Sequence, residues 1–142
     1  MTILILYGPN LNLIGLKGSQ LKTRLTLDKV NRAIRRHVRE KGINLKIIQT
    51  HKEHLAINFI QRNRNSADGL VIVPTSWAKY NQTILETINI AELPTSSVYF
   101  DDSYSFGTNE DESIFVSNNI KSFIGKPTET IISAIDFLAN KK

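Results

Sequence analysis

The 142-residue chain contains no cysteine, one methionine and one tryptophan. Without cysteine it forms no disulfide, no thiolate metal site and no cysteine nucleophile, and this composition fits a reducing, cytoplasmic location. No apolar run approaches the roughly 20 residues that a membrane-spanning helix needs, so we expect no membrane partner. The hydrophobic and charged fractions, 41% and 22%, are ordinary for a globular protein. The length predicts one domain over residues 1–142.

Acidic residues are outnumbered by basic ones, 13 to 18, and the formal net charge is +5. Much of the basic excess lies in residues 29–41, where lysine and arginine are interrupted by Val30, Ile34 and Val38. This pattern is typical of the solvated face of an amphipathic helix. The stretch has no aromatic side chains that would stack on bases, and no nucleic-acid motif accompanies it, so we expect no nucleic-acid partner.

Apolar runs that are typical of buried strands alternate along the chain with stretches of helical periodicity. The predicted strands are 2–6, 43–49, 69–73 and 96–100, with a fifth at either 114–116 or 120–124. The predicted helices are 26–41, 54–64, 80–91 and 128–140, the first and last of them capped by Thr26 and Thr128. This alternation predicts an α/β flavodoxin-like three-layer sandwich, in which helices cover both faces of a five-stranded parallel sheet of order 2-1-3-4-5.

Ligands of such sheets bind outside the carboxyl ends of the strands, which directs attention to the first loop, YGPNLN. Gly8 permits unusual backbone angles, and Asn10 and Asn12 offer amide donors and acceptors to a ligand. Asparagine side chains also close turns on their own backbone. The chemistry of the loop alone leaves both interpretations open.

The sequence gives no support for a metal site or a metal cofactor. His51 and His54 lack a third ligand at zinc spacing, and the acidic residues at 101–102 and 110–112 fit no known cation-binding loop. We therefore expect the acidic segment to be a solvated loop.

The segment ILILYGPNLNLIG resembles the opening of the type II 3-dehydroquinate dehydratases, which typically carry asparagine where Tyr7 stands. The segments LTLDKV, IIQTHKEHLAINFIQ, ADGLVIVPTSWAKYN and ELPTSSVYFDDS resemble later parts of the same family, and the likeness weakens after about Asp101. The resemblance implies a lyase of the shikimate or quinate pathway that uses neither a metal nor an organic cofactor. It also implies homo-oligomers, either trimers or dodecamers built from trimers.

In that family a tyrosine with a pKa lowered by an arginine removes a proton beside a ketone. An asparagine and a water then stabilise the enolate, and a histidine protonates the departing hydroxyl. The resemblance places the asparagine at Asn12. The arginine position falls on Lys17 and the tyrosine position on Lys22, with Arg24 nearby but shifted, and the histidine position falls on Tyr104.

The positions that the resemblance assigns to substrate binding are altered as well. Asn10 and Pro74 are kept in the strand-end loops, whereas an asparagine is replaced by Val73, which cannot form a hydrogen bond through its side chain, and a histidine by Lys79.

The pair of residues that holds the substrate carboxylate falls on Asp101 and Asp102. Like charges a few ångströms apart cost on the order of several kcal/mol when they are partly desolvated. Protonation of one aspartate, or a cation from Lys17, Lys22, Arg24 or Lys79, would relieve this repulsion.

These departures predict a dehydratase-like protein, a pseudoenzyme whose parental activity is lost or replaced and whose pocket takes an anionic or polyhydroxylated small molecule. One alternative is an active enzyme that converts 3-dehydroquinate to 3-dehydroshikimate with displaced residues, for example Tyr104 or Tyr80 as the base beside Arg24. Another is a different enzyme on the same scaffold, with Asp101 or Asp102 as its general base.

Overall fold

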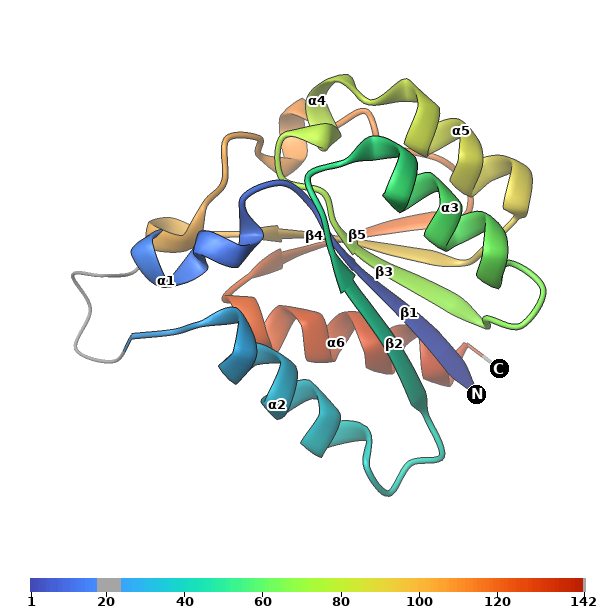
Figure 1. Cartoon of the computed structure of the whole chain (residues 1–142), viewed down its shortest axis with the longest axis horizontal. Helices are drawn as coiled ribbons and strands as arrows, with labels where there is room; N and C mark the ends of the chain where they lie inside the picture. Colours follow the sequence, from blue (N-terminus) through green and yellow to red (C-terminus); the bar gives the residue numbers. More distant parts are fainter. Residues whose placement is uncertain (18–23, 142) are drawn as a thin grey trace.

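The computed structural model describes residues 1–17 and 24–141, except for the side chain of Asp102. Its strands are β1 (Thr2–Tyr7), β2 (Asn44–Gln49), β3 (Gly69–Val73), β4 (Thr95–Phe100) and β5 (Ile120–Gly125). They form one five-stranded sheet of order β2-β1-β3-β4-β5 in which every strand pair is parallel, as Figure 1 shows. The predicted flavodoxin-like arrangement is therefore confirmed, and the fifth strand is the second of the two predicted candidates.

Helices cover both faces of the sheet (Figure 1). The α-helices are α1 (Ile14–Lys17), α2 (Leu27–Val38), α3 (Glu53–Asn63), α4 (Trp77–Tyr80), α5 (Gln82–Ala91) and α6 (Pro127–Asn140), and the 3-10 helices are η1 (Leu11–Leu13), η2 (Asp102–Tyr104) and η3 (Glu110–Glu112). Helices α2 and α6 pack on one face and α3 and α5 on the other. Within the described ranges, no helix is both long enough and apolar enough to cross a membrane.

Two of the predicted helix boundaries need correction. The predicted cap of α2 is present, because Thr26 Oγ1 accepts a hydrogen bond from the backbone N–H of Lys29 at 3.2 Å, but the helix ends at Val38 rather than at residue 41. Thr128 does not cap α6, which begins at Pro127. Proline suits the first helical position because its φ is fixed and it has no N–H that needs a partner.

The single helix predicted over residues 80–91 is two helices, α4 and α5, separated by Asn81. The side-chain oxygen of Asn81 accepts a hydrogen bond from the backbone N–H of Ile84 at 2.9 Å and so caps α5. The chain therefore leaves the helical conformation at Asn81, between α4 and α5.

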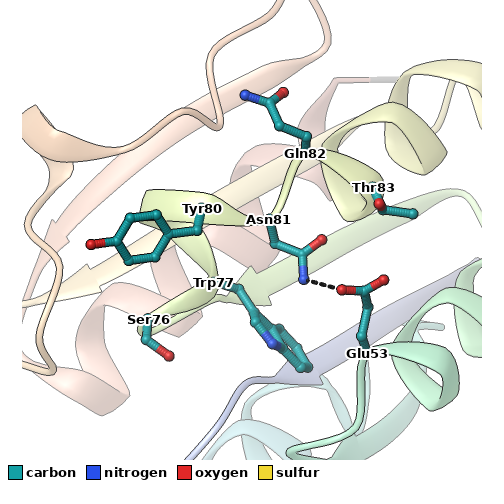
Figure 2. Close-up of a pocket in the computed structure, with 7 residues that line it drawn as sticks. All are labelled: Glu53, Ser76, Trp77, Tyr80, Asn81, Gln82 and Thr83. Carbon is teal, nitrogen blue, oxygen red and sulfur yellow. Dashed lines mark hydrogen bonds between the residues drawn. The ribbon is translucent and has the colours of Figure 1, made fainter.

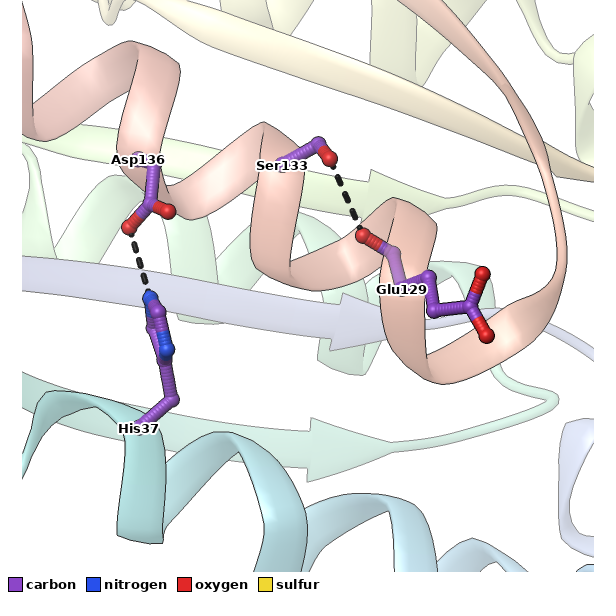
Figure 3. Close-up of polar contacts among 4 residues, drawn as sticks. All are labelled: His37, Glu129, Ser133 and Asp136. Carbon is purple, nitrogen blue, oxygen red and sulfur yellow. Dashed lines mark hydrogen bonds and ion pairs between the residues drawn. The ribbon is translucent and has the colours of Figure 1, made fainter.

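The central strands carry the core. Ile3, Ile5 and Tyr7 of β1 point into the layer of α2 and α6, whereas Leu4 and Leu6 point into the layer of α3 and α5, and all five side chains are fully buried. The α2 and α6 helices are also joined by a hydrogen bond between His37 Nε2 and Asp136 Oδ1 at 2.8 Å, as Figure 3 shows. The rigid strands fix where the loops at the carboxyl edge begin.

Candidate functional site

The carboxyl ends of β1 and β3 approach each other closely. The backbone N–H of Gly8 donates to the carbonyl oxygen of Val73 at 2.8 Å, and a Cβ atom on Gly8 would lie only 2.5 Å from the carbonyl oxygen of Pro74. Only glycine allows this approach. The side-chain Nε2 of Gln49 donates to the carbonyl oxygen of Gly8 at 3.1 Å, which also ties the end of β2 to the same loop.

Two residues at this edge adopt a left-handed backbone conformation that non-glycine residues rarely take. Asn10 has a φ of 68°, and Thr75 in the facing loop has a φ of 51°. The Thr75 hydroxyl donates to the carbonyl oxygen of Pro9 at 2.9 Å, and the backbone N–H of Asn10 donates to Nδ1 of His51 at 3.1 Å. Backbone strain of this kind is typical of binding sites, where the surrounding structure must hold it in place.

Asn12 lies in η1 and is exposed. Within residues 1–17 and 24–141, the side chains of Asn10 and Asn12 make no hydrogen bond, so neither amide closes a turn on its own backbone. Of the two interpretations that the sequence leaves open, the structure favours the one in which both amides are available to a ligand.

The loop after β4 folds over the ends of β3 and β4. Phe106 is half-buried and packs against the core, and the ammonium of Lys17 lies 5.3 Å from the centre of its ring. Beneath the loop a cavity of about 10 Å³ remains, with Val73, Thr75, Phe100, Phe106 and Thr108 among its lining residues. Such a volume holds about one water molecule.

Asp101 follows β4 directly, and its Oδ1 atom is buried with no hydrogen-bond partner among the described atoms. The cations expected to neutralise it are engaged elsewhere. Lys79 Nζ lies 3.5 Å from Glu112 Oε2, Arg24 Nε donates to a backbone oxygen of α1 at 3.3 Å, and Lys17 lies over the ring of Phe106. Lys22 and the side chain of Asp102 fall outside the described residues.

The alternative in which the enzyme stays active needs a tyrosine as its base, for example Tyr104 or Tyr80, and the environment of each tyrosine tests whether it suits that role. Tyr7 ends β1, but its hydroxyl points away from the loop and donates to Asn31 Oδ1 of α2 at 2.8 Å. Burial raises the pKa of Tyr7 despite the opposing charge of Arg35, and burial likewise raises the pKa of Tyr99. Raised pKa values are the opposite of what a tyrosine base requires.

The remaining tyrosines offer no guanidinium partner in the described part of the chain. Tyr104 lies half-buried in η2, where its backbone N–H donates to the carbonyl oxygen of Asp101 at 3.2 Å. Tyr80 is 75% exposed, and it has Lys79 5.7 Å from its ring centre rather than Arg24.

A separate open pocket of about 370 Å³ lies where α3, α4 and α5 begin (Figure 2). Asn81 Nδ2 donates to Glu53 Oε2 at 2.8 Å across it, a contact that the sequence analysis missed. Trp77 is 8% exposed and belongs to the core beneath α3 and α5, whereas Tyr80 stands at the rim. Among the residues with described positions, no three histidine or acidic side chains come together as a metal site.

The molecule is thus a flavodoxin-like α/β protein with a candidate site at the carboxyl ends of β1, β3 and β4. The structure brings Asn10, Val73 and Pro74 together at this edge, and Lys17 and Asp101 flank the loop above it, whereas Lys79 turns toward Glu112.

The family model "Dehydroquinase class II" matches residues 1–139, and the chain belongs to this family. The 3-dehydroquinate dehydratase of Geotalea daltonii is 33% identical over 99 residues, which are 70% of this chain and 69% of that protein. A 3-dehydroquinate dehydratase of Clostridium botulinum is 25% identical over 138 residues, which are 97% and 94% of the two chains. The crystal structure of type II dehydroquinase from Butyrivibrio crossotus is similar in fold, with a TM-score of 0.83, 24% identity and coverage of 98% and 97%.

Proposed function

We propose that this type II dehydroquinase-like protein has lost or replaced the parental dehydratase activity and keeps a small-molecule pocket at the carboxyl ends of its strands. The observation that carries the loss of the parental activity is the small space left between the ends of β3 and β4 beneath the following loop. Phe106 and Thr108 reach the ends of β3 and β4, and only about 10 Å³ remains beneath them. Small-molecule sites typically offer about 300–1,000 Å³.

The chemistry of the surrounding groups supports the same conclusion. Proton abstraction beside a ketone needs a base that is unprotonated near neutral pH. Lys17 stands where the family carries its arginine, and its side chain lies against the ring of Phe106, where no tyrosine hydroxyl is present for it to activate. Val73 offers no side-chain hydrogen bond to the substrate, and Asp101, whose Oδ1 atom is buried with no hydrogen-bond partner among the described atoms, supplies no positive charge to a substrate carboxylate.

The rest of the proposal follows from family membership and composition. The chain is one domain over residues 1–142 and assembles as a homo-oligomer, a trimer or a dodecamer, in the cytoplasm. Its ligand is a small anionic or polyhydroxylated molecule. The ligand is contacted from the segment between β1 and α2 by Asn12, Lys17 and Arg24. It is contacted from the loop after β4 by Asp101 and Tyr104.

The test is a dehydratase assay on the purified chain. 3-Dehydroquinate is added, and the ultraviolet absorbance of the conjugated enone product is followed against a buffer blank. We expect no rate above the blank. Turnover that is abolished in N12A and kept in N89A would refute the proposal, because Asn89 is also an exposed asparagine but lies near the C-terminal end of α5.

A further inference from the structure

His51 is one of three described side chains that hold the backbone of the first loop, together with Gln49 and Thr75. The amide of Gln49 and the hydroxyl of Thr75 do not titrate near neutral pH, whereas histidine gains a proton between about pH 8 and pH 5. Of these three contacts, the hydrogen bond between Asn10 and His51 is therefore the one that pH can break.

The direction of this hydrogen bond determines which ring nitrogen carries the proton. The backbone N–H of Asn10 can only donate, so Nδ1 of His51, 3.1 Å away, must be the unprotonated nitrogen. The proton of the neutral ring is then on Nε2. A second proton on Nδ1 would turn this acceptor into a donor, and two N–H groups would face each other. Protonation of His51 therefore abolishes the contact.

Asn10 depends on such contacts because its backbone is strained. Its φ of 68° lies in the left-handed region, which non-glycine residues rarely adopt unless the surrounding structure holds them there. Asn10 also precedes η1, and its carbonyl oxygen accepts a hydrogen bond from the backbone N–H of Leu13 at 2.9 Å. Asn12 lies in this turn. Loss of the His51 contact therefore loosens the turn that places Asn12 at the carboxyl edge of the sheet.

The charged groups of this region do not replace the contact. The first loop, residues 8–13, and the facing loop, residues 74–78, contain no titratable side chain. The titratable neighbours of His51 in its own segment are Lys52, Glu53 and His54. Glu53 accepts a hydrogen bond from Asn81 at 2.8 Å on the side of the open pocket (Figure 2). The cations farther along the edge are engaged elsewhere, Lys17 over Phe106, Arg24 with α1 and Lys79 with Glu112. In the described part of the chain, no carboxylate forms an ion pair with His51, so its hydrogen bond with Asn10 is the contact that distinguishes the two protonation states.

We propose that His51 is a positioning residue that makes the strand-end site dependent on pH. Neutral His51 holds Asn10 and thereby keeps Asn12 at the pocket, whereas doubly protonated His51 releases the first loop. This inference rests on the proposed function, because it assigns a means of regulation to the pocket at the carboxyl ends of the strands. A pocket whose binding-competent form is less populated binds its ligand more weakly, so mildly acid conditions weaken binding.

The experiment is a pH titration of the isotope-labelled full chain between about pH 8 and pH 5, followed by NMR. At the alkaline end, the ring of His51 should show an unprotonated Nδ1 and a protonated Nε2. As the ring gains its second proton, the amide of Asn10 should lose roughly fivefold of its protection against hydrogen exchange, the effect of one hydrogen bond. The backbone and side-chain amide resonances of Asn12 should shift with the same midpoint.

Two variants separate this hydrogen bond from other effects of pH. In H51Q the side-chain oxygen can accept from Asn10 but does not titrate, so the transition should disappear while the protection of Asn10 remains. The matched control H54Q removes the other exposed histidine of this segment and should leave the transition unchanged. The proposal would be overturned by a wild-type Asn10 amide that ignores pH, by a transition that persists in H51Q, or by one that does not reach Asn12. Dehydratase turnover by the wild type would refute the lost activity without changing this titration.

Discussion

Replacement of Gly8 by alanine tests whether the carboxyl ends of β1 and β3 are in direct backbone contact. The added Cβ would lie 2.5 Å from the oxygen and 2.9 Å from the carbon of the Pro74 carbonyl group, well inside the 3.4 Å at which ordinary contact begins. Both neighbours are backbone atoms, so no side chain can turn away. Relief requires the two strand ends to separate, which stretches the 2.8 Å hydrogen bond from Gly8 to Val73.

The expected loss in the free energy of unfolding follows from these contacts. Overpacking of this kind costs about 1–3 kcal/mol, and a weakened buried hydrogen bond adds about 1 kcal/mol. The reduced entropy of the unfolded chain returns about 0.4–1 kcal/mol. We expect G8A to lose about 2–3 kcal/mol, which corresponds to a fall in Tm of roughly 6–9 °C for a chain of this length.

Urea unfolding followed by tryptophan fluorescence measures this loss. Trp77 is the only tryptophan of the chain and is 8% exposed when folded, so its emission reports the transition. The control is G42A, where φ is +69° and no atom lies within 4 Å of the added Cβ, so that only the backbone angle opposes alanine. That angle costs about 1–2 kcal/mol. If G8A were no less stable than G42A, the close approach of β1 and β3 would be refuted.

Two further predictions concern pH. Burial raises the pKa of Tyr7, so the stability that its neutral hydroxyl contributes is complete below the ordinary tyrosine pKa of about 10 and is lost as the pH rises through the raised folded value. In urea unfolding, the free energy of unfolding of Y7F should therefore fall less steeply with alkaline pH than that of the wild type. Equal slopes for the two proteins would contradict a buried hydroxyl. The hydrogen bond from the Asn109 backbone, followed by the charge of Lys79, lowers the pKa of Glu112, so its contribution is present above the ordinary glutamate pKa of about 4.3 and is lost as the pH falls through the lowered folded value. Thermal melts of E112Q should therefore show a flatter acid limb than those of E40Q, which removes an exposed carboxyl group outside this contact, and identical limbs would count against the contact.

The fold could be predicted from the sequence because its signals are local. Runs such as TILIL and GLVIV are typical of strands that are buried on both faces in a parallel sheet, and they form β1 and β3. The predicted helix boundaries were wrong where two local signals compete. Thr128 is a good cap by type, but Pro127 before it suits the first helical turn better, and Asn81 caps a new helix in the middle of an amphipathic stretch.

The filling of the candidate site could not be predicted, because it depends on contacts between distant segments. Phe106 stands in a polar loop, and its only local signal is the glycine that follows it. Whether such a ring points to solvent or into the sheet edge is decided by Val73 and Lys17, which lie tens of residues away in the chain. The partner of Lys79 could not be predicted for the same reason, since its ammonium lies 3.5 Å from Glu112 Oε2, a residue 33 positions further along the chain.

The elements that shape the strand-end edge are separate from those that would do chemistry there. Gly8, Gln49 and Thr75 hold the loops through backbone contacts and single hydrogen bonds, and none of these contacts involves a side chain that moves a proton. Side chains such as Lys17 and Phe106 can therefore change while the edge keeps its geometry. Similarity to a family that rests on these backbone contacts therefore indicates the fold but gives little information about the reaction. The chemistry of the site depends instead on the side chains at the carboxyl edge of the sheet, where the ammonium group of Lys17 lies over the ring of Phe106.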